Sequence, residues 1–515
     1  MVSLIDFISV SGTSASGGIP NVFLTILLFF FAATTALVSY PPAYLKKKYE
    51  DYQMARGVLK GGDLGTFTTL ELAARVVKFK ADLEVTGKED LPQLNLDVGA
   101  MVTGETDIDM IRKYWPFYPG LTYEQCADGV HVKIKGDDHT CTLMSSLSYW
   151  AFHVNEEVRD YAFKKVIESG SGNHGSYLLL GKNTVVEESY EAMSRFFNRK
   201  YCSFSASGFL ACMNLVGAIA PRGGVIFMDE KCHVCLRFGG KVAGCKVFKF
   251  PHQNYDALEK MMAKHRHKYN GRALLVVDAI YSADGTIANL PRAREVCDKY
   301  NTVIVMDEAH SLGSIGKTGR GIEEHFNMPG ACDYICGVFS KALSSYGGYV
   351  VSNEPYTECL NISPGVGFAT GPHSFSAATV TKAIEIIERD GLKVRSAIDK
   401  MRAYYVDKLA NVAKCCNIID CGHNVFVSFP HMYAACTVAV EMRKRGYLIS
   451  SFMFPSVPTD RSILRLTLNP LTTHEILDGF CKTLGEVMEA LVPRFGRDIM
   501  FGRHNAAYYE EISHS

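Results

Sequence analysis

The sequence has no excess of charge of either sign, because its 54 lysines and arginines balance 54 aspartates and glutamates over 515 residues. A basic excess is typical of proteins that bind nucleic acid, so its absence predicts no nucleic-acid partner. The sequence also lacks internal repeats and low-complexity tracts, which argues against a repeat protein or a largely disordered chain. A chain of this length can bury more than one core, and we expect two folded lobes plus additional segments.

A disulfide framework is missing as well. The 16 cysteines are scattered through apolar segments rather than framing a small domain, which fits a reducing compartment. Cys232 and Cys235 form a CxxC pair, but no second pair follows at the spacing of a zinc site, and the spacing of Cys332 and Cys336 does not supply one. The sequence therefore predicts no metal site.

Charged residues are absent between Asp6 and Lys46, and residues 22–38 form a nearly unbroken apolar run. With its flanks, at about residues 21–40, this run approaches the roughly 20 residues needed to cross a bilayer. Lysines occupy positions 46–48, so the positive-inside rule predicts a single-pass anchor with the body of the protein in the cytosol. A cleaved signal peptide would need a positive charge before the run, and none is present. A buried core helix is the remaining alternative.

The middle of the chain predicts an α/β fold. Short apolar runs rich in β-branched residues occupy 225–229, 245–250, 273–278 and 302–307 and alternate with helix-length segments. This pattern favours a mainly parallel sheet with helices on both faces. We divide the chain into an N-terminal segment (1–45), a connecting or dimer-arm region (46–140), a large domain (141–372), a smaller α+β C-terminal domain (373–500) and a tail (501–515).

Several helix ends can also be predicted. Asn155 is a plausible cap for a helix that carries acids in its first turn and ends at Gly170. We expect two successive helices over residues 378–391 and 395–410, and a capped helix that opens at Thr472.

The strongest chemical signal lies between residues 303 and 349. An apolar run ends in Asp307, His310 follows three residues later, and Lys341 stands among small hydroxyl residues and glycines. Pyridoxal phosphate is carried as a Schiff base on a lysine amine, and it works as an electron sink only while a carboxylate keeps its pyridine nitrogen protonated. We therefore predict that Lys341 carries this cofactor, that Asp307 faces the pyridine nitrogen and that His310 donates to the phenolic oxygen.

We expect other site residues to lie around Lys341. Gly208 and Phe209 open a helix whose free N–H groups suit the cofactor phosphate. His233 follows a strand and either stacks on the pyridine ring or is structural. Ser282 reaches the cofactor oxygen or serves a turn. Arg465 lies in an apolar strand, where a buried guanidinium is costly unless paired, and a substrate carboxylate would supply the partner.

The order of these motifs resembles a known family. The segments SGF, DEKCHV, DAIYSADG, MDEAHSLGSIGKTGRG, FSKALSSYGGY and LRLTLNP resemble the α-oxoamine synthases, fold-type I pyridoxal-phosphate enzymes that condense an amino acid with an acyl-CoA. The resemblance covers about residues 140–495 and implies a dimer with shared active sites. It implies the cofactor and substrate roles given above for Lys341, Asp307, His310, His233, Gly208, Phe209 and Arg465.

The predicted anchor narrows what the resemblance implies. Relatives that make 5-aminolevulinate, 2-amino-3-ketobutyrate or biotin precursors are soluble, whereas serine palmitoyltransferases work at the endoplasmic reticulum membrane. The resemblance then implies condensation of L-serine with palmitoyl-CoA to 3-ketosphinganine, the first step of sphingolipid synthesis, in a homodimer or a heterodimer. A different amino acid and acyl-CoA pair, or a catalytically weak partner subunit, are the alternatives.

Four features depart from the family pattern. Val338 stands where a threonine commonly binds the phosphate, and Ser340 is the residue that could replace it. Leu147 stands for an asparagine and Tyr177 for an arginine, and the proline pair at the entry to the small lobe is missing. These positions concern phosphate binding, acyl-CoA handling and amino-acid choice rather than the fold.

Overall fold

The computed structural model describes residues 121–137, 139–220, 223–412, 418–430, 432–452, 457 and 461–501. The predicted membrane anchor at about residues 21–40, the connecting region up to residue 120 and the tail lie outside these residues, and their predictions stand untested. All described residues belong to the compact unit Asp107–Ser515. None of the helices in these described ranges combines the length and the apolar character needed to span a bilayer.

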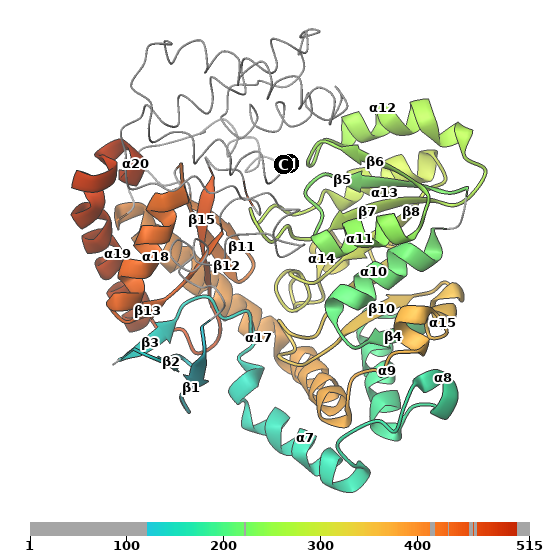
Figure 1. The fold of residues 1–515 in the computed structure, drawn as a ribbon, viewed down its shortest axis with the longest axis horizontal. Coiled ribbons are helices and arrows are strands. Elements are labelled where there is room, and N and C mark those ends of the chain that lie inside the picture. The colour runs from blue at the N-terminus through green and yellow to red at the C-terminus, as the bar shows by residue number, and fades with distance from the viewer. Residues whose placement is uncertain are drawn as a thin grey trace, which may run out of the picture. The chain divides into compact units, whose positions relative to one another are not determined.

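A seven-stranded mixed sheet forms the centre of the larger lobe (Figure 1). Its strands run in the order β4 (Tyr201–Ser205), β10 (Gly348–Ser352), β9 (Tyr334–Val338), β8 (Val303–Asp307), β7 (Ala273–Asp278), β5 (Val225–Asp229) and β6 (Lys246–Phe250). The pairings from β9 to β6 are parallel, and β10 runs antiparallel to both of its neighbours. The mainly parallel sheet expected from the four apolar runs is therefore present, with bounds that differ by at most one residue.

Helices cover both faces of this sheet, because its central strands are apolar on both sides. One face packs against α10 (Gly208–Ile219) and α11 (Val234–Val242), through side chains such as Leu215 and Leu236. The other face packs against α9 (Thr184–Phe197), α12 (Tyr255–His265), α13 (Leu290–Lys299) and the first half of α17 (Ser374–Val412). Alternate residues of β10, β9, β8, β7 and β5 enter the two cores, as the period of a strand requires.

The smaller lobe is built on a four-stranded antiparallel sheet in the order β11, β12, β15, β14. These strands are Ile418–Cys421, Asn424–Phe429, Ser462–Thr467 and Ser450–Phe452, and α18 (Met432–Lys444), α19 (His474–Phe495) and α20 (Arg497–Phe501) complete the lobe. A further sheet joins β1 (Tyr123–Gln125), β2 (His131–Ile134) and β3 (Thr140–Leu143) to β13 (Tyr447–Leu448). We did not predict these short strands, because two to four residues are too few to show an alternating pattern.

The long helix α17 connects the two lobes and corrects a prediction. Two helices were expected with a break near Gly391, but Ser374–Val412 is one continuous helix of 39 residues. Gly391 is buried, and a Cβ there would overlap the carbonyl oxygen of Thr318. This glycine therefore permits close approach of a loop rather than ending the helix. The helix contributes Ile384 to the core of the large lobe and Tyr405 to that of the small lobe.

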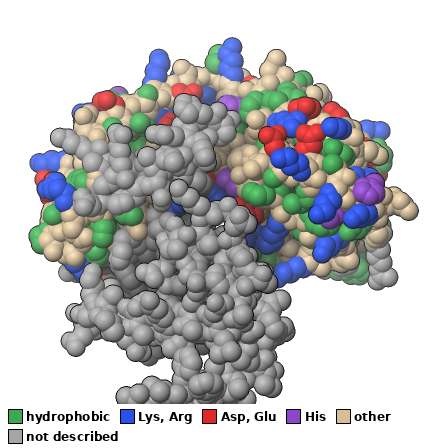
Figure 2. Space-filling view, turned by 90° about the horizontal axis from the view of Figure 1, so that it is seen from above, with side chains coloured by type: hydrophobic (Ala, Val, Ile, Leu, Met, Phe, Trp, Pro, Cys, Tyr) green, Lys and Arg blue, Asp and Glu red, His purple; other side chains and the backbone are tan. Residues whose placement is uncertain are grey.

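Helix ends follow their capping residues. Asn155 caps α7 (Glu156–Ser169) by accepting from the backbone nitrogen of Val158, as predicted. Thr473 caps α19 by accepting from Ile476, one residue later than the predicted Thr472. Over the face shown in Figure 2, acidic and basic side chains lie interspersed rather than separated by sign.

Candidate active site

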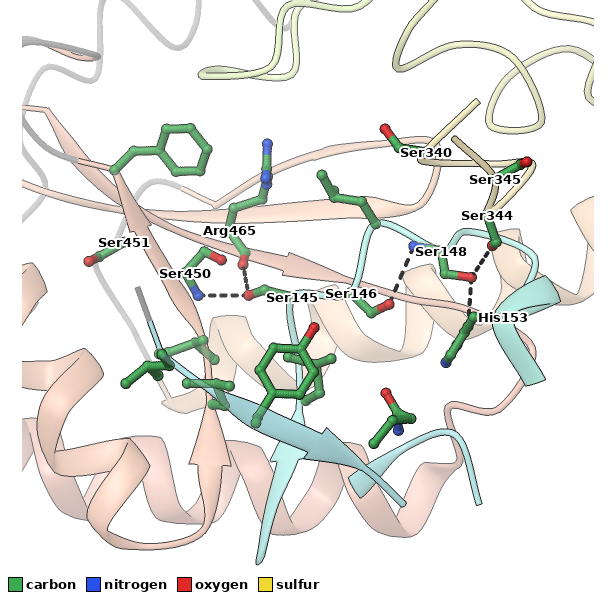
Figure 3. Close-up of a pocket in the computed structure, with 18 residues that line it drawn as sticks. Ser145, Ser146, Ser148, His153, Ser340, Ser344, Ser345, Ser450, Ser451 and Arg465 are labelled. Carbon is green, nitrogen blue, oxygen red and sulfur yellow. Dashed lines mark hydrogen bonds between the residues drawn. The ribbon is translucent and has the colours of Figure 1, made fainter. Parts of the chain in front are cut away.

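A cavity lies at the carboxyl ends of β7 and β8, where ligands bind in open α/β sheets. The fold brings seven of the nine predicted site residues together in its lining: Gly208, Phe209, His233, Ser282, Asp307, His310 and Lys341. Ser340 and Arg465 instead line a wider groove beside it (Figure 3). Residues separated by more than 130 positions in the sequence therefore form one cavity.

Asp307 is the last residue of β8 and is buried. One carboxylate oxygen accepts from the backbone nitrogen of Ala309 at 2.9 Å, and the other accepts from the thiol of Cys212 at 3.6 Å. Asp278 ends the neighbouring strand directly opposite Asp307. Burial, together with the charge of Asp307, raises the pKa of Asp278 well above its ordinary value. The site thus disfavours a second negative charge beside Asp307.

Lys341 lies in the loop between β9 and β10 and lines the same cavity. Burial lowers the pKa of its amine to about 8, although the negative charge of Asp307 opposes this shift. A lysine with such a pKa has a substantial neutral fraction near neutral pH, and the neutral amine is the form that reacts with a carbonyl. The geometry is consistent with the role predicted for Lys341.

His310 is buried, and its Nδ1 lies 2.8 Å from the hydroxyl of Tyr149. Burial lowers the pKa of His310 well below its ordinary value, and the positive charges of Lys341 and Arg465 act in the same direction. The imidazole is therefore neutral and can donate from only one ring nitrogen.

His233 both caps a helix and lines the cavity. It is the cap of α11, where its Nδ1 accepts from the backbone nitrogen of Cys235 at 3.4 Å. Its own backbone nitrogen donates to Asp278 at 3.2 Å, and its side chain lines the cavity. A hydrogen bond with the Cys235 thiol raises the pKa of His233. This geometry is thus compatible both with a structural role for His233 and with the predicted stacking of His233 on the pyridine ring of the cofactor.

The N-terminal turn of α10 forms one end of the cavity. Ser207 caps this helix by accepting from the backbone nitrogen of Leu210 at 3.2 Å. A Cβ on Gly208 would overlap the side chain of Val338, so the valine methyl groups lie directly against this turn. The predicted phosphate site therefore has an apolar wall where the family pattern has a hydroxyl. Ser340 is exposed and faces the groove rather than this turn.

Arg465 projects from β15 toward the groove (Figure 3). Its guanidinium lies 4.5 Å from the ring of Phe452, and one Nη donates weakly to the carbonyl oxygen of Ser282 at 3.4 Å. Its Nε is buried without a hydrogen-bond partner, and no carboxylate pairs with it within the described part of the chain. A buried guanidinium with unused donors fits the prediction that a carboxylate ligand binds here.

Two departures from the family pattern have clear structural positions. Tyr177 is buried and donates to the carbonyl oxygen of Pro372 at 3.2 Å, so it has a structural partner. Leu147 lines the groove. Apolar side chains also line the groove at Leu121, Leu143, Leu448, Ile449 and Phe452, together with several serines.

Sequence reasoning missed four residues at the site. Asp278 offered a usable signal, since it ends an apolar strand as Asp307 does. Tyr149, Cys212 and Cys235 offered none, because isolated tyrosines and cysteines in apolar segments are usually core residues. Cys212, Cys336 and Asp307 have ligand atoms within 4.8 Å of one another, so a cation there would occupy the Asp307 carboxylate.

These residues fit pyridoxal phosphate. A lysine with a lowered pKa, a buried carboxylate and a neutral histidine donor line one cavity that ends at the start of a helix. The model of the class I and II aminotransferases matches residues 155–484. The chain belongs to this family.

The curated relatives agree with the resemblance to the α-oxoamine synthases. The chain is 27% identical over 397 residues to 8-amino-7-oxononanoate synthase of Thermoanaerobacter pseudethanolicus, covering 75% of this chain and 98% of the relative. It is also 27% identical over 368 residues to serine palmitoyltransferase of Caulobacter vibrioides, covering 71% and 90%. The structure of Sphingomonas wittichii serine palmitoyltransferase superposes with a TM-score of 0.70 at 20% identity, over 78% of this chain and 99% of that one. The chain therefore has the fold-type I architecture predicted for it and belongs to a family of pyridoxal-phosphate enzymes.

Proposed function

We propose that this protein is an α-oxoamine synthase that condenses L-serine with palmitoyl-CoA and releases carbon dioxide and CoA to give 3-ketosphinganine. The observation that carries the proposal is the place of Arg465. Its guanidinium, which has no carboxylate partner among the described residues, lies in a partly apolar groove beside the cavity that contains Lys341. An amino-acid carboxylate and a long acyl chain can therefore be bound next to the reactive lysine.

The cofactor, when bound, supplies an electron sink for the charge left on the substrate α-carbon. Asp307 would face its pyridine nitrogen, and His310 would donate to its phenolic oxygen. Lys341 takes the α-proton of the amino acid as a neutral amine, which its lowered pKa favours. Arg465 holds the carboxylate until decarboxylation, and its charge fixes the orientation of the substrate.

The acyl substrate is proposed to lie in the groove. Leucines and Phe452 give this groove an apolar side, while Ser145, Ser148 and Ser450 line it with hydroxyl groups (Figure 3). Burial of an alkyl chain contributes about 0.8 kcal/mol for each methylene group, so even partial cover favours a long chain over a short one.

The cellular setting rests on the sequence. The predicted anchor at about residues 21–40 would hold the enzyme at the endoplasmic reticulum membrane with its catalytic domain in the cytosol, close to the lipid product. Family members form dimers, and the proposal includes a homodimer or a heterodimer with a related subunit.

The test is a turnover assay with the purified full-length chain in detergent, loaded with pyridoxal phosphate. CoA release is followed with serine, alanine or glycine against palmitoyl-CoA and shorter acyl-CoAs, with Lys341→Ala as the inactive control. The proposal predicts the highest kcat/KM for serine with palmitoyl-CoA. A preference for another pair would contradict it and favour the activity of other relatives, among which 8-amino-7-oxononanoate synthases are numerous. Cofactor binding without turnover until a related chain is added would indicate a partner subunit.

A further inference from the structure

Four buried side chains form a continuous hydrogen-bonded series that ends at the cavity. The hydroxyl of Thr467 lies 3.1 Å from Oδ1 of Asn424, and Nδ2 of Asn424 lies 3.2 Å from the hydroxyl of Tyr149. The hydroxyl of Tyr149 lies 2.8 Å from Nδ1 of His310. Thr467 and Asn424 belong to β15 and β12 of the small lobe, whereas His310 follows β8 of the large sheet.

The donors and acceptors along this hydrogen-bonded series can be assigned from the chemistry of its side chains. Asn424 accepts from Thr467 through Oδ1, so its amide nitrogen donates to the oxygen of Tyr149. Burial raises the pKa of Tyr149 to about 12, which keeps the phenol protonated. A protonated phenol that accepts from Asn424 has its own proton left for Nδ1 of His310. The single proton of the neutral imidazole must then reside on Nε2.

The ring of Tyr149 is held in place independently of these bonds. His423 stacks on it, with centroids 5.0 Å apart and planes inclined by 22°. His423 is itself held by donation from one ring nitrogen to a backbone carbonyl oxygen, either that of Leu468 at 2.8 Å or that of Gly313 at 3.2 Å. The phenol therefore has little freedom to turn away from His310, because the packing fixes its plane.

We propose that Tyr149 and Asn424 are positioning residues that fix the tautomer of His310, with the proton on Nε2. The histidine is then a permanent donor to an acceptor oxygen in the cavity, such as the phenolic oxygen of the cofactor. This role rests on the proposed function only for the identity of that oxygen. The tautomer itself is a property of the protein without cofactor.

The decisive experiment is therefore done on cofactor-free, full-length protein. Imidazole nitrogens are labelled with ¹⁵N, and the His310 signals are assigned as those lost in His310→Gln. The expected result is a neutral ring with a protonated Nε2 and an unprotonated, hydrogen-bonded Nδ1. A ring protonated on Nδ1, or an even mixture of tautomers, would overturn the proposal. A failed turnover assay would leave this result unchanged, so the two failures can be told apart.

A variant series adds a functional readout. Tyr149→Phe removes the donor to Nδ1, and the expected results are a mixed tautomer and roughly 2- to 10-fold weaker binding of pyridoxal phosphate, the loss typical of one hydrogen bond. Tyr404→Phe is the matched control, since Tyr404 bonds to Asp478 outside the series. Unchanged cofactor affinity and an unchanged tautomer in Tyr149→Phe would contradict the proposal. If that variant does not fold, the wild-type tautomer still decides.

Discussion

Val338 offers the sharpest test of how this site binds a phosphate. The side chain ends β9 and lies against the first turn of α10, where a Cβ on Gly208 would overlap it. Threonine has nearly the same shape as valine and replaces one methyl group by a hydroxyl. Val338→Thr should therefore place a hydrogen-bond donor at the wall of the predicted phosphate site with little change in packing.

The expected change in affinity for pyridoxal phosphate is the difference between two opposing free-energy contributions. A hydrogen bond to a charged group is worth about 1.5 to 3 kcal/mol. Packing a hydroxyl where a methyl group fits costs about 1 kcal/mol. The net gain of about 0.5 to 2 kcal/mol corresponds to roughly 2- to 30-fold tighter binding of pyridoxal phosphate.

Equilibrium dialysis of cofactor-free protein measures this change directly. Val338→Ala is the control for a change in packing, because it removes both methyl groups without adding a hydrogen-bond donor and should not tighten binding. Equal affinities of wild type and Val338→Thr, or an equal gain in Val338→Ala, would refute the placement of the phosphate at this helix.

Three further predictions concern other groups of the site. Because only the neutral amine of Lys341 reacts with a carbonyl, the rate of cofactor uptake should rise with pH up to about 8 and then level off. Stopped-flow absorbance measures this rate, and a rise that continues toward pH 10 would contradict the lowered pKa of Lys341. Arg465→Lys should raise KM for serine about 10-fold or more, because the bidentate contact with the carboxylate is lost. The affinity for pyridoxal phosphate should stay unchanged, and a weaker cofactor affinity would instead indicate a structural role for Arg465. Burial raises the pKa of Glu308 to about 8, so its carboxyl holds a proton more tightly in the folded than in the unfolded state, and its contribution to stability is lost as pH rises toward 8. The melting temperature should therefore fall less between pH 5 and pH 8 in Glu308→Gln than in wild type, and parallel curves would argue against that shift.

The sequence predicted the parts of this site that follow from local pattern. Apolar strands that end in a polar residue placed Asp307 and His310 at the edge of the sheet, and Gly208 was correctly predicted to open a helix. The pairing partners of these residues could not be predicted in the same way. Tyr149 meets His310 across 161 positions of sequence, and Asn424 meets Tyr149 across 275. Such contacts depend on how the lobes pack, and the local periodicity of the sequence does not predict that packing.

Gly391 shows the same limit in the fold. A glycine in a helical pattern is consistent both with a helix end and with close packing, and the contact with Thr318 that decides between them is distant in sequence. The short strands β1 to β3 likewise became visible only through their pairing with one another and with β13.

Lys341 is the residue predicted to carry pyridoxal phosphate, and the roles of the other residues in the cavity depend on it. Purified protein loaded with the cofactor can be reduced with borohydride, digested and searched by mass spectrometry for the modified lysine. We predict one modified residue, Lys341, and no incorporation in Lys341→Ala. Modification of a different lysine with Lys341 left free would contradict the assignment of this cavity as the cofactor site.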